Sequence, residues 1–333
     1  MDWKIGEVER VEITTICDNY VDTLYMDPPG KKIRRRGLGF AFNPANMGKK
    51  LVADNCSAML IDLFAFEGNQ IGVVDPYRIL FDCGGNGEIL MSNLKSMDVD
   101  PLSINHIVIS HGHPDHMGGI KAVLEARNGV PCPVVIHPDT FSPRYILSPH
   151  GFVFPHFTAA LPSKEECEAV GARFVSVTEP VKVGPGCMTT GPIPWNEDVP
   201  FEPSPITIYH MEEEKFVLDK TPDEMALAIN VKGYGLVVVS GCAHNGIINT
   251  IRCCQSVSGV ENVYAVLGGF HLGFPEVPRQ MTAQTIEKLK EVPGLKVICP
   301  MHCTGFRATA EIMNAFPDEY IQDSLGNTIC LPF

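Results

Sequence analysis

The stretch VISHGHPDHMGG, at residues 108–119, constrains the fold of this 333-residue chain more than any other. Its β-branched start and the apolar residues before it predict a buried strand over residues 104–110. A helix is expected from Gly118 to Arg127, because two glycines are followed by the amphipathic run IKAVLEAR. The residues between them must form a tight loop from strand to helix.

Four metal-binding side chains fall in that loop, with the spacing H-x-H-x-D-H: His111, His113, Asp115 and His116. Alternation along an extended segment places His111 and His113 on one side, where two imidazoles can grip one cation. Asp115 and His116, past the bend, can face a second cation. Imidazole nitrogen and carboxylate oxygen suit zinc, iron or manganese. A polar turn with incidental histidines explains four such residues poorly.

The rest of the chain predicts an α/β fold, with a strand-rich first half and a second half that alternates strands and helices. No internal repeat, low-complexity tract or flexible linker divides the sequence. We therefore expect one domain over residues 1–333, with long loops at about residues 17–57 and 142–205.

The amino-acid composition limits the classes of molecule that the protein can be expected to bind. The formal net charge of −13 argues against a nucleic acid or an anionic membrane as partner. The basic stretch from Lys31 to Arg36 is better explained as a solvated loop than as a flap over an anionic substrate. No apolar stretch approaches the ~18 residues of a membrane span. The N-terminus lacks a signal-peptide pattern, and the twelve cysteines form no disulfide framework, so a reduced, cytoplasmic protein is expected. The sequence leaves open whether the protein forms a homo-oligomer.

Several further stretches share one resemblance. They are HGHPDHMGG, ILFDCGG at residues 79–85, GLVVVSGCAHNGIINTI at 235–251, AVLGGFHL at 265–272 and MHCTG at 301–305. Together they resemble the metallo-β-lactamase superfamily, in the branch of 7,8-dihydropterin-6-yl-methyl-4-(β-D-ribofuranosyl)aminobenzene 5'-phosphate synthase-like proteins. The resemblance implies an αββα sandwich, two mixed sheets flanked by helices, with one or two metal ions at the edge of the sheets.

The resemblance also implies a ligand set. The first two histidines of the motif would serve one metal, and its aspartate and third histidine the other. His302 matches the late histidine that completes the second site. Many relatives take the third ligand of the first site from a middle segment, but the corresponding residues here, 188–194 (MTTGPIP), contain no histidine. His244, just past the expected strand 236–240, is expected to replace it, rather than only to form hydrogen bonds or cap a helix.

Cys242 and His271 are secondary candidates. Cys242 stands where many relatives place a bridging aspartate. A buried structural thiol is favoured over a thiolate ligand there, although a nearby metal would lower its pKa. His271 is a further candidate for a metal ligand, with contact to the ligand residues or to the substrate as the alternative. The pair Asp223-Glu224, before the expected strand 225–231, is better explained as a charged turn than as part of the site.

Three residues are candidates for substrate contact. Thr304 and Arg307 lie near the start of an expected helix, where free amides favour a phosphate. Asn55 matches a position of the resembling branch and is expected near the cleft. The other histidines are expected to be structural or at the surface.

These features predict a metal-dependent hydrolase that uses one or two divalent cations, zinc first, to activate water. It would cleave a phosphoester, ester or lactone of a small, anionic molecule. Asp115 would act in catalysis by holding the second metal and carrying a proton. The alternative is a transferase that couples a dihydropterin pyrophosphate to an aminobenzene ribofuranosyl 5'-phosphate. A second alternative is a metal-binding or redox protein without hydrolytic activity.

Overall fold

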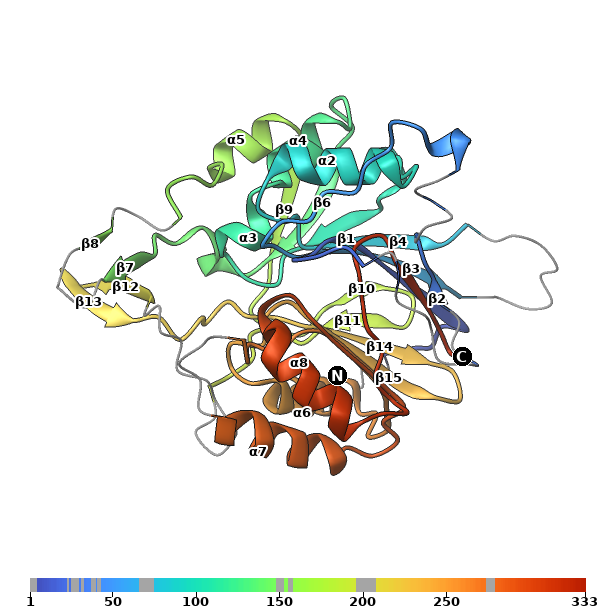
Figure 1. Ribbon diagram of the computed structural model, residues 1–333. Helices are drawn as coiled ribbons and strands as arrows, with labels where there is room; N and C mark the ends of the chain where they lie inside the picture. Colours follow the sequence, from blue (N-terminus) through green and yellow to red (C-terminus); the bar gives the residue numbers. More distant parts are fainter. Residues whose placement is uncertain are drawn as a thin grey trace.

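The structure is a computed structural model that describes residues 5–22, 24, 30, 33–36, 40, 43–65, 75–147, 153–154, 158–195, 208–273 and 279–333. Two large mixed sheets lie face to face, and helices cover the outer side of each (Figure 1). The expected αββα sandwich is confirmed.

The first sheet has eight strands. In spatial order they are β2 (Ile33–Arg34), β18 (Thr328–Leu331), β1 (Arg10–Cys17), β3 (Ala58–Phe64), β4 (Tyr77–Phe81), β5 (His106–Val108), β6 (Cys132–Ile136) and β9 (Ala172–Ser176). The four from β4 to β9 are parallel, and the other pairs are antiparallel. Its outer side carries α2 (Gly87–Ser96), α4 (Ile120–Glu125) and α5 (Lys164–Ala169) (Figure 1).

The second sheet has six strands. They are β10 (Lys182–Gly184), β11 (Cys187–Thr189), β14 (Leu227–Val231), β15 (Gly235–Ser240), β16 (Val263–Gly269) and β17 (Val297–Met301). Its outer side carries α6 (Ile247–Ser258), α7 (Arg279–Lys290) and α8 (Gly305–Ala315) (Figure 1). A third, small sheet was not expected. It consists of β13 (Lys215–Leu218), β12 (Ile208–Glu212), β7 (Tyr145–Leu147) and β8 (Val153–Phe154).

Apolar side chains on both faces of the strands build three core layers. Along β3, Met59 and Ile61 point into the layer between the sheets, and Leu60 points toward the helices of the first sheet. Along β15, Val237 lies between the sheets and Val238 lies under the helices of the second. Each fully buried side chain of this size stabilises the fold by roughly 1.5–3 kcal/mol. The layers hold the ends of the central strands in fixed positions.

The metal-binding motif folds differently from the expectation in one respect. The helix expected at Gly118 begins earlier, as the short α3 (Pro114–Met117), and α4 follows after a break. Proline favours the first helical position because its φ is already helical and it needs no amide partner. Gly118 lies against the carbonyl of Gly85, where a Cβ would come within 2.0 Å of the oxygen. Asp115 therefore lies in a helical turn rather than in a loop.

The expected long loops contain regular structure in their described parts. Residues 17–57 include β2 and a short 3-10 helix, Pro44–Asn46. Residues 142–205 include strands from both the small sheet and the second sheet, together with α5. The prediction of one domain remains a prediction. No helix in the described ranges is long and apolar enough to cross a membrane.

The described part of the basic stretch, residues 33–36, is anchored to neighbouring strands and loops, although Arg34 is exposed. Arg34, in β2, pairs with Glu12 of β1. Arg35 donates to the carbonyl of Gln322, and Arg36 to that of Gly326. Lys31 and Lys32 lie outside the described residues. The described part of this stretch is therefore neither a free loop nor a flap.

Asp323 gives a prediction about stability. It is buried, its Oδ2 accepts from the Thr15 hydroxyl at 2.6 Å, and its Oδ1 has no hydrogen-bond partner. Burial, with the nearby Asp18, raises the pKa of Asp323 to about 7. Because this pKa exceeds that of the unfolded chain, about 4, the stabilising contribution is complete below pH 4 and is lost as the pH rises through 7.

The variant Asp323→Asn removes that loss. Its free energy of unfolding, relative to the wild type, is expected to increase by up to about 4 kcal/mol between pH 4 and pH 8. Urea unfolding at several pH values, with both proteins in the same metal state, measures the difference. A difference that stays constant across this range would contradict the raised pKa.

Candidate metal centre

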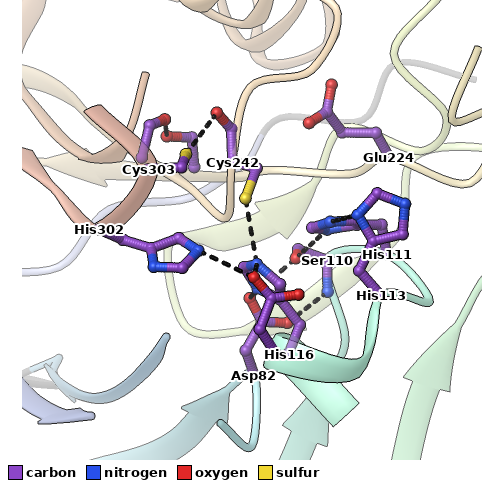
Figure 2. A network of polar contacts seen from close by, with 12 residues as sticks. Asp82, Ser110, His111, His113, His116, Glu224, Cys242, His302 and Cys303 are labelled. Carbon is purple, nitrogen blue, oxygen red and sulfur yellow. Dashed lines mark hydrogen bonds and ion pairs between the residues drawn. The ribbon is translucent and has the colours of Figure 1, made fainter. Parts of the chain in front are cut away.

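The metal-binding residues of the chain gather where strands of both sheets end. The motif follows β5 of the first sheet, while His244 follows β15 and His302 follows β17 of the second. Because β15 and β17 run parallel to the strand between them, their C-terminal ends lie at the same edge. The facing sheets therefore bring together side chains that are far apart in the sequence (Figure 2).

Three histidines form a first donor cluster. Nε2 of His111 lies 3.0 Å from Nδ1 of His113 and 3.2 Å from Nε2 of His244. Two ligands of a tetrahedral zinc, each about 2.05 Å from the metal, are separated by about 3.3 Å. The three nitrogens therefore have the chemistry and the spacing to hold one cation.

The ring of His111 and the loop of His244 are both fixed by neighbours. The Ser110 hydroxyl lies 2.9 Å from Nδ1 of His111, which leaves Nε2 to the cluster. The two carboxylate oxygens of Glu224 accept from the backbone amides of His244 and Asn245, at 2.5 and 2.9 Å. Partners of this kind orient metal ligands and set their tautomers.

A buried ion network fixes the motif loop. Asp223 accepts from the amide of Gly112 at 2.7 Å and from the Arg144 guanidinium at 2.6 Å. Arg144 also donates to Asp219 at 2.6 Å, and the side chains of all three ionic residues are at most 3% exposed. At Gly112 a Cβ would lie 1.9 Å from the carbonyl oxygen of Thr140. Only glycine lets the loop pass this close to that backbone.

A second donor cluster contains Asp115, His116 and His302. Oδ2 of Asp115 lies 3.3 Å from Nε2 of His302 and 3.8 Å from Nε2 of His116. Nδ1 of His116 donates to buried Asp82 at 2.7 Å, so its Nε2 points into the cluster (Figure 2). A carboxylate behind a histidine is the arrangement that orients and strengthens a metal ligand.

His302 is held by residues that follow β1. Its backbone amide donates to Asp18 at 3.0 Å, and its carbonyl accepts from the Asn19 side chain at 2.8 Å. Its φ of 47° is in the left-handed region, which non-glycine residues rarely occupy. Ala243 and His271, on neighbouring strand ends, share this conformation, with φ of 58° and 51°. Such strain is typical of functional sites.

Two cysteines, Cys242 and Cys303, lie close to the donor clusters, and Cys242 is near residues of both. Sγ of Cys242 is 3.1 Å from Nε2 of His116. Its donor atom lies within 4.8 Å of those of His111 and His116, and also of those of His302 and Cys303. The buried structural thiol expected for Cys242 is indeed buried, but it is surrounded by metal-binding groups.

The two clusters differ in protonation. Burial, together with the neighbouring histidines and Arg144, holds the pKa values of His111, His113 and His244 well below the usual range. These rings are therefore neutral, with lone pairs available to a cation.

In the second cluster burial disfavours the charged form of each residue, but the carboxylate and the protonated histidines stabilise one another's charges. His116 and His302 hold the pKa of Asp115 well below its usual range. Asp115, together with Cys303 and Asp18, outweighs burial at His302 and raises its pKa to about 10. Asp115 and Asp82 likewise raise the pKa of His116. A cation at this position would replace the protons of the two histidines.

His271 lies beside the first cluster, with its ring centroid 4.1 Å from that of His244. It belongs to none of the donor groups among the described residues. His106 contacts the Tyr77 hydroxyl at 3.0 Å, and His137 caps a short 3-10 helix, in line with structural roles. Histidines 150 and 156 lie outside the described residues.

The three candidates for substrate contact have different surroundings. Thr304 is fully buried, and its hydroxyl accepts from the amide of Phe270 at 3.0 Å, so its contact is with the protein. Arg307 lies in the first turn of α8 and is half-buried. Asn55 is exposed in the segment before β3, next to Asp54.

Several residues that position the ligands were missed or misread. The turn expected at Asp223-Glu224 is present, but the expectation that it is unrelated to the site is wrong, since the two residues are 0% and 1% exposed and support both ligand loops. Asp82 had a signal, because an acidic residue that ends the apolar strand of ILFDCGG needs a buried partner. Arg144 had none, because its partners lie more than 70 residues away.

Comparisons with known proteins agree with this fold. Residues 73–198 match the model of the metallo-β-lactamase superfamily. Over 326 residues the chain is 36% identical to 7,8-dihydropterin-6-methyl-4-(β-D-ribofuranosyl)-aminobenzene-5'-phosphate synthase of Methanocaldococcus jannaschii, covering 98% of both chains.

Solved structures support the fold. The metal-dependent hydrolase Tm1679 of the β-lactamase superfamily superposes with a TM-score of 0.65 at 20% identity, covering 97% of this chain and 99% of the other. The metallo-β-lactamase fold protein YhfI of Bacillus subtilis gives 0.51 at 13% identity, with coverages of 97% and 99%. The full-length relative, the family match and the shared sandwich together show that this chain belongs to the metallo-β-lactamase superfamily of enzymes.

Proposed function

We propose that the chain is a metal-dependent hydrolase with two cation positions. The first position would be held by His111, His113 and His244, and the second by Asp115, His116 and His302. The observation that carries this proposal is the approach of two complete donor clusters at one edge of the sandwich. The proposal is supported further by the residues that hydrogen-bond to the ligands and orient them: Ser110, Asp82 and Glu224.

Zinc is the cation we propose first. Three neutral imidazoles suit zinc, and a mixed set of carboxylate, imidazole and nearby sulfur suits it as well. Iron and manganese are the alternatives, and the absence of a bridging aspartate is where this chain departs from many relatives. All twelve cysteines are free thiols, which supports a reducing, cytoplasmic setting and calls for anaerobic handling.

The proposed reaction is the cleavage of a phosphoester, ester or lactone of a small anionic molecule. Cations held at the two positions would lower the pKa of a water molecule and neutralise charge that develops on the substrate. Asp115 is ionised and 31% exposed, and its Oδ2 faces the two histidines of the second position; its other oxygen, Oδ1, would accept a proton from the attacking water and pass it to the leaving group. Arg307 and Asn55 remain proposed contacts for the anionic part of the substrate.

The transferase reaction is the second candidate. The observation that favours it is the 36% identity to the synthase over nearly the whole of both chains. In this version a dihydropterin pyrophosphate is coupled to an aminobenzene ribofuranosyl 5'-phosphate, and the same cation positions would take the departing pyrophosphate. The acceptor distinguishes the two reactions: water in the hydrolase, and in the transferase the amine of the aminobenzene, which forms the new bond to carbon and loses a proton as pyrophosphate leaves.

One assay separates the candidates. Anaerobically purified, metal-loaded protein is given a dihydropterin pyrophosphate, with and without the aminobenzene ribofuranosyl phosphate, and products are followed by mass spectrometry. A coupled product establishes the transferase. Release of phosphate or pyrophosphate without coupling supports hydrolysis, and a panel of phosphodiesters and lactones then narrows the substrate. Asp115→Asn is expected to lower either rate ~10²–10⁴-fold.

Failure of all these substrates would contradict both activities. The metal content is tested separately: two equivalents of zinc per chain are expected by elemental analysis. A chain that retains no zinc would contradict the metal proposal itself.

Glu224→Gln tests the support of the first position. An amide cannot accept from two backbone amides with both of its atoms, so the loop that carries His244 is expected to shift. Zinc affinity at the first position should fall ~10–100-fold, as for other partners behind a ligand. Competition with a chelator measures it. Glu212→Gln, an exposed residue on β12, is the matched control, and equal affinities in the two variants would contradict this role of Glu224.

A further inference from the structure

Two cysteines lie at the second cation position, each just after a strand of the second sheet. Cys242 follows β15, and Cys303 follows β17 directly after His302. The donor atoms of these three residues all lie within 4.8 Å of one another. This is a third donor group, and it shares His302 with the group that contains Asp115.

The backbone leaves room for the second sulfur. Sγ of Cys303 lies 3.4 Å from the carbonyl oxygen of Cys242. At Gly269 a Cβ would come within 2.6 Å of this sulfur and 3.0 Å of the Cα of Cys242. A larger residue at 269 would therefore push the thiol out of its place beside Cys242.

The remaining cysteines have a different environment. Among the described residues, only Cys242 and Cys303 belong to the groups that could hold a metal. Cys254 and Cys299, for example, are buried in apolar core layers, as free cysteines often are. Two thiols beside a histidine are donors that a soft or borderline cation prefers.

We propose that Cys242 and Cys303 both ligate the second cation as thiolates, so that this position is rich in sulfur. This inference rests on the proposed metal centre, not on the substrate. On binding, each thiol releases its proton to solvent, and the cation gains two anionic ligands. The position then selects zinc, cobalt or iron(II) over manganese and magnesium, which prefer oxygen ligands. The first position, with three imidazoles, has no such preference for sulfur.

The test begins with the zinc-loaded wild-type protein. X-ray absorption at the zinc edge distinguishes sulfur at about 2.3 Å from nitrogen and oxygen at about 2.0–2.1 Å. With both positions filled, one zinc has two sulfur ligands and the other has none. The spectrum averages over the two ions and should therefore show about one sulfur per zinc. No sulfur scattering would overturn the proposal. This measurement needs no variant, so a failure to fold cannot obscure it.

Cobalt substitution then assigns the sulfurs. The wild type is expected to show thiolate-to-cobalt charge-transfer absorption in the near ultraviolet. Cys242→Ser and Cys303→Ser should each lose about half of its intensity, and each should weaken zinc binding at the second position at least ~100-fold. The matched control is Cys253→Ser on α6, a cysteine that is likewise half-buried, and its spectrum should not change.

The outcomes separate this inference from the proposed function. An unchanged spectrum in Cys303→Ser would overturn the two-thiolate position, even if the enzyme is active. Manganese that competes equally with zinc at the second position would also overturn it. Sulfur ligation in a protein that turns over none of the substrates above would support this inference and count against the proposed reactions alone.

Discussion

His302→Ala and His116→Ala are each expected to remove the second cation and to lower the rate of turnover on the order of 10³-fold or more. The fold should remain, because the ring of His302 meets the protein mainly through Asp115 and Asn19. Elemental analysis should find close to one zinc per chain in each variant, and two in the wild type. His210→Ala, at a half-buried histidine in β12 of the small sheet, is the control.

The two histidines should differ in one respect. Asp82 is buried and also accepts from the amide of Ser110 at 2.7 Å. Removal of the His116 ring leaves this carboxylate short of one partner, so His116→Ala should also be less stable, by about 1–3 kcal/mol. Full zinc content and full activity in both variants would show that the second cluster is not a metal site.

The sequence predicted which candidate ligands gather in the structure where the signal is local. Four ligand-type residues within six positions have few explanations other than a cation, and the surrounding apolar runs predict strands whose ends meet. His302 was found from the resemblance to a family, and His244 because it stands just past an expected strand, where it can replace the ligand that the middle segment lacks. The resemblance to a family supplied the pairing of these two with the motif, which spacing alone cannot give.

Partners that act over long distances in the sequence could not be predicted. Asp223 and Glu224 follow Thr-Pro and carry charge, and both features are typical of a surface turn. Their burial depends on Arg144 and on two backbone loops from other strands, and no local pattern contains that information. The small sheet was missed for a similar reason, because each of its strands has five or fewer residues and several lie among prolines.

The helix that was expected to begin at Gly118 begins four residues earlier, as α3, and the cause is local. The glycines at 118 and 119 suggest a helix start, but Gly119 leaves a break because its position lies against the carbonyl of Cys83, where a Cβ would be 2.2 Å away. Proline at 114 begins a separate turn. The consequence is functional: Asp115 and His116 are held by helical hydrogen bonds, which fix their direction more tightly than a loop would.

Arg144→Met is expected to cause the largest loss of stability among single substitutions discussed for this chain. The guanidinium is 1% exposed and neutralises Asp219 and Asp223 at 2.6 Å each. Methionine keeps much of the volume but leaves two carboxylates buried without a counter-charge, which costs about 3–5 kcal/mol. Urea unfolding measures the loss. Lys288→Met, which breaks an exposed pair with Glu291, should lose at most about 1 kcal/mol.

Two further variants separate charge from packing. If unpaired charge is the cause, Arg144→Met combined with Asp219→Asn and Asp223→Asn should recover most of the loss, because no charge then remains buried. The amide oxygen that replaces the carboxylate at position 223 can still accept from the amide of Gly112, so zinc affinity at the first position should recover as well. Arg144→Lys should not restore stability, since one ammonium cannot reach both carboxylates with the geometry of a guanidinium. No recovery in the triple variant would mean that packing around Arg144, rather than its charge, holds the loop between His111 and His113. Recovery by lysine would mean that one positive charge is sufficient without the geometry of a guanidinium.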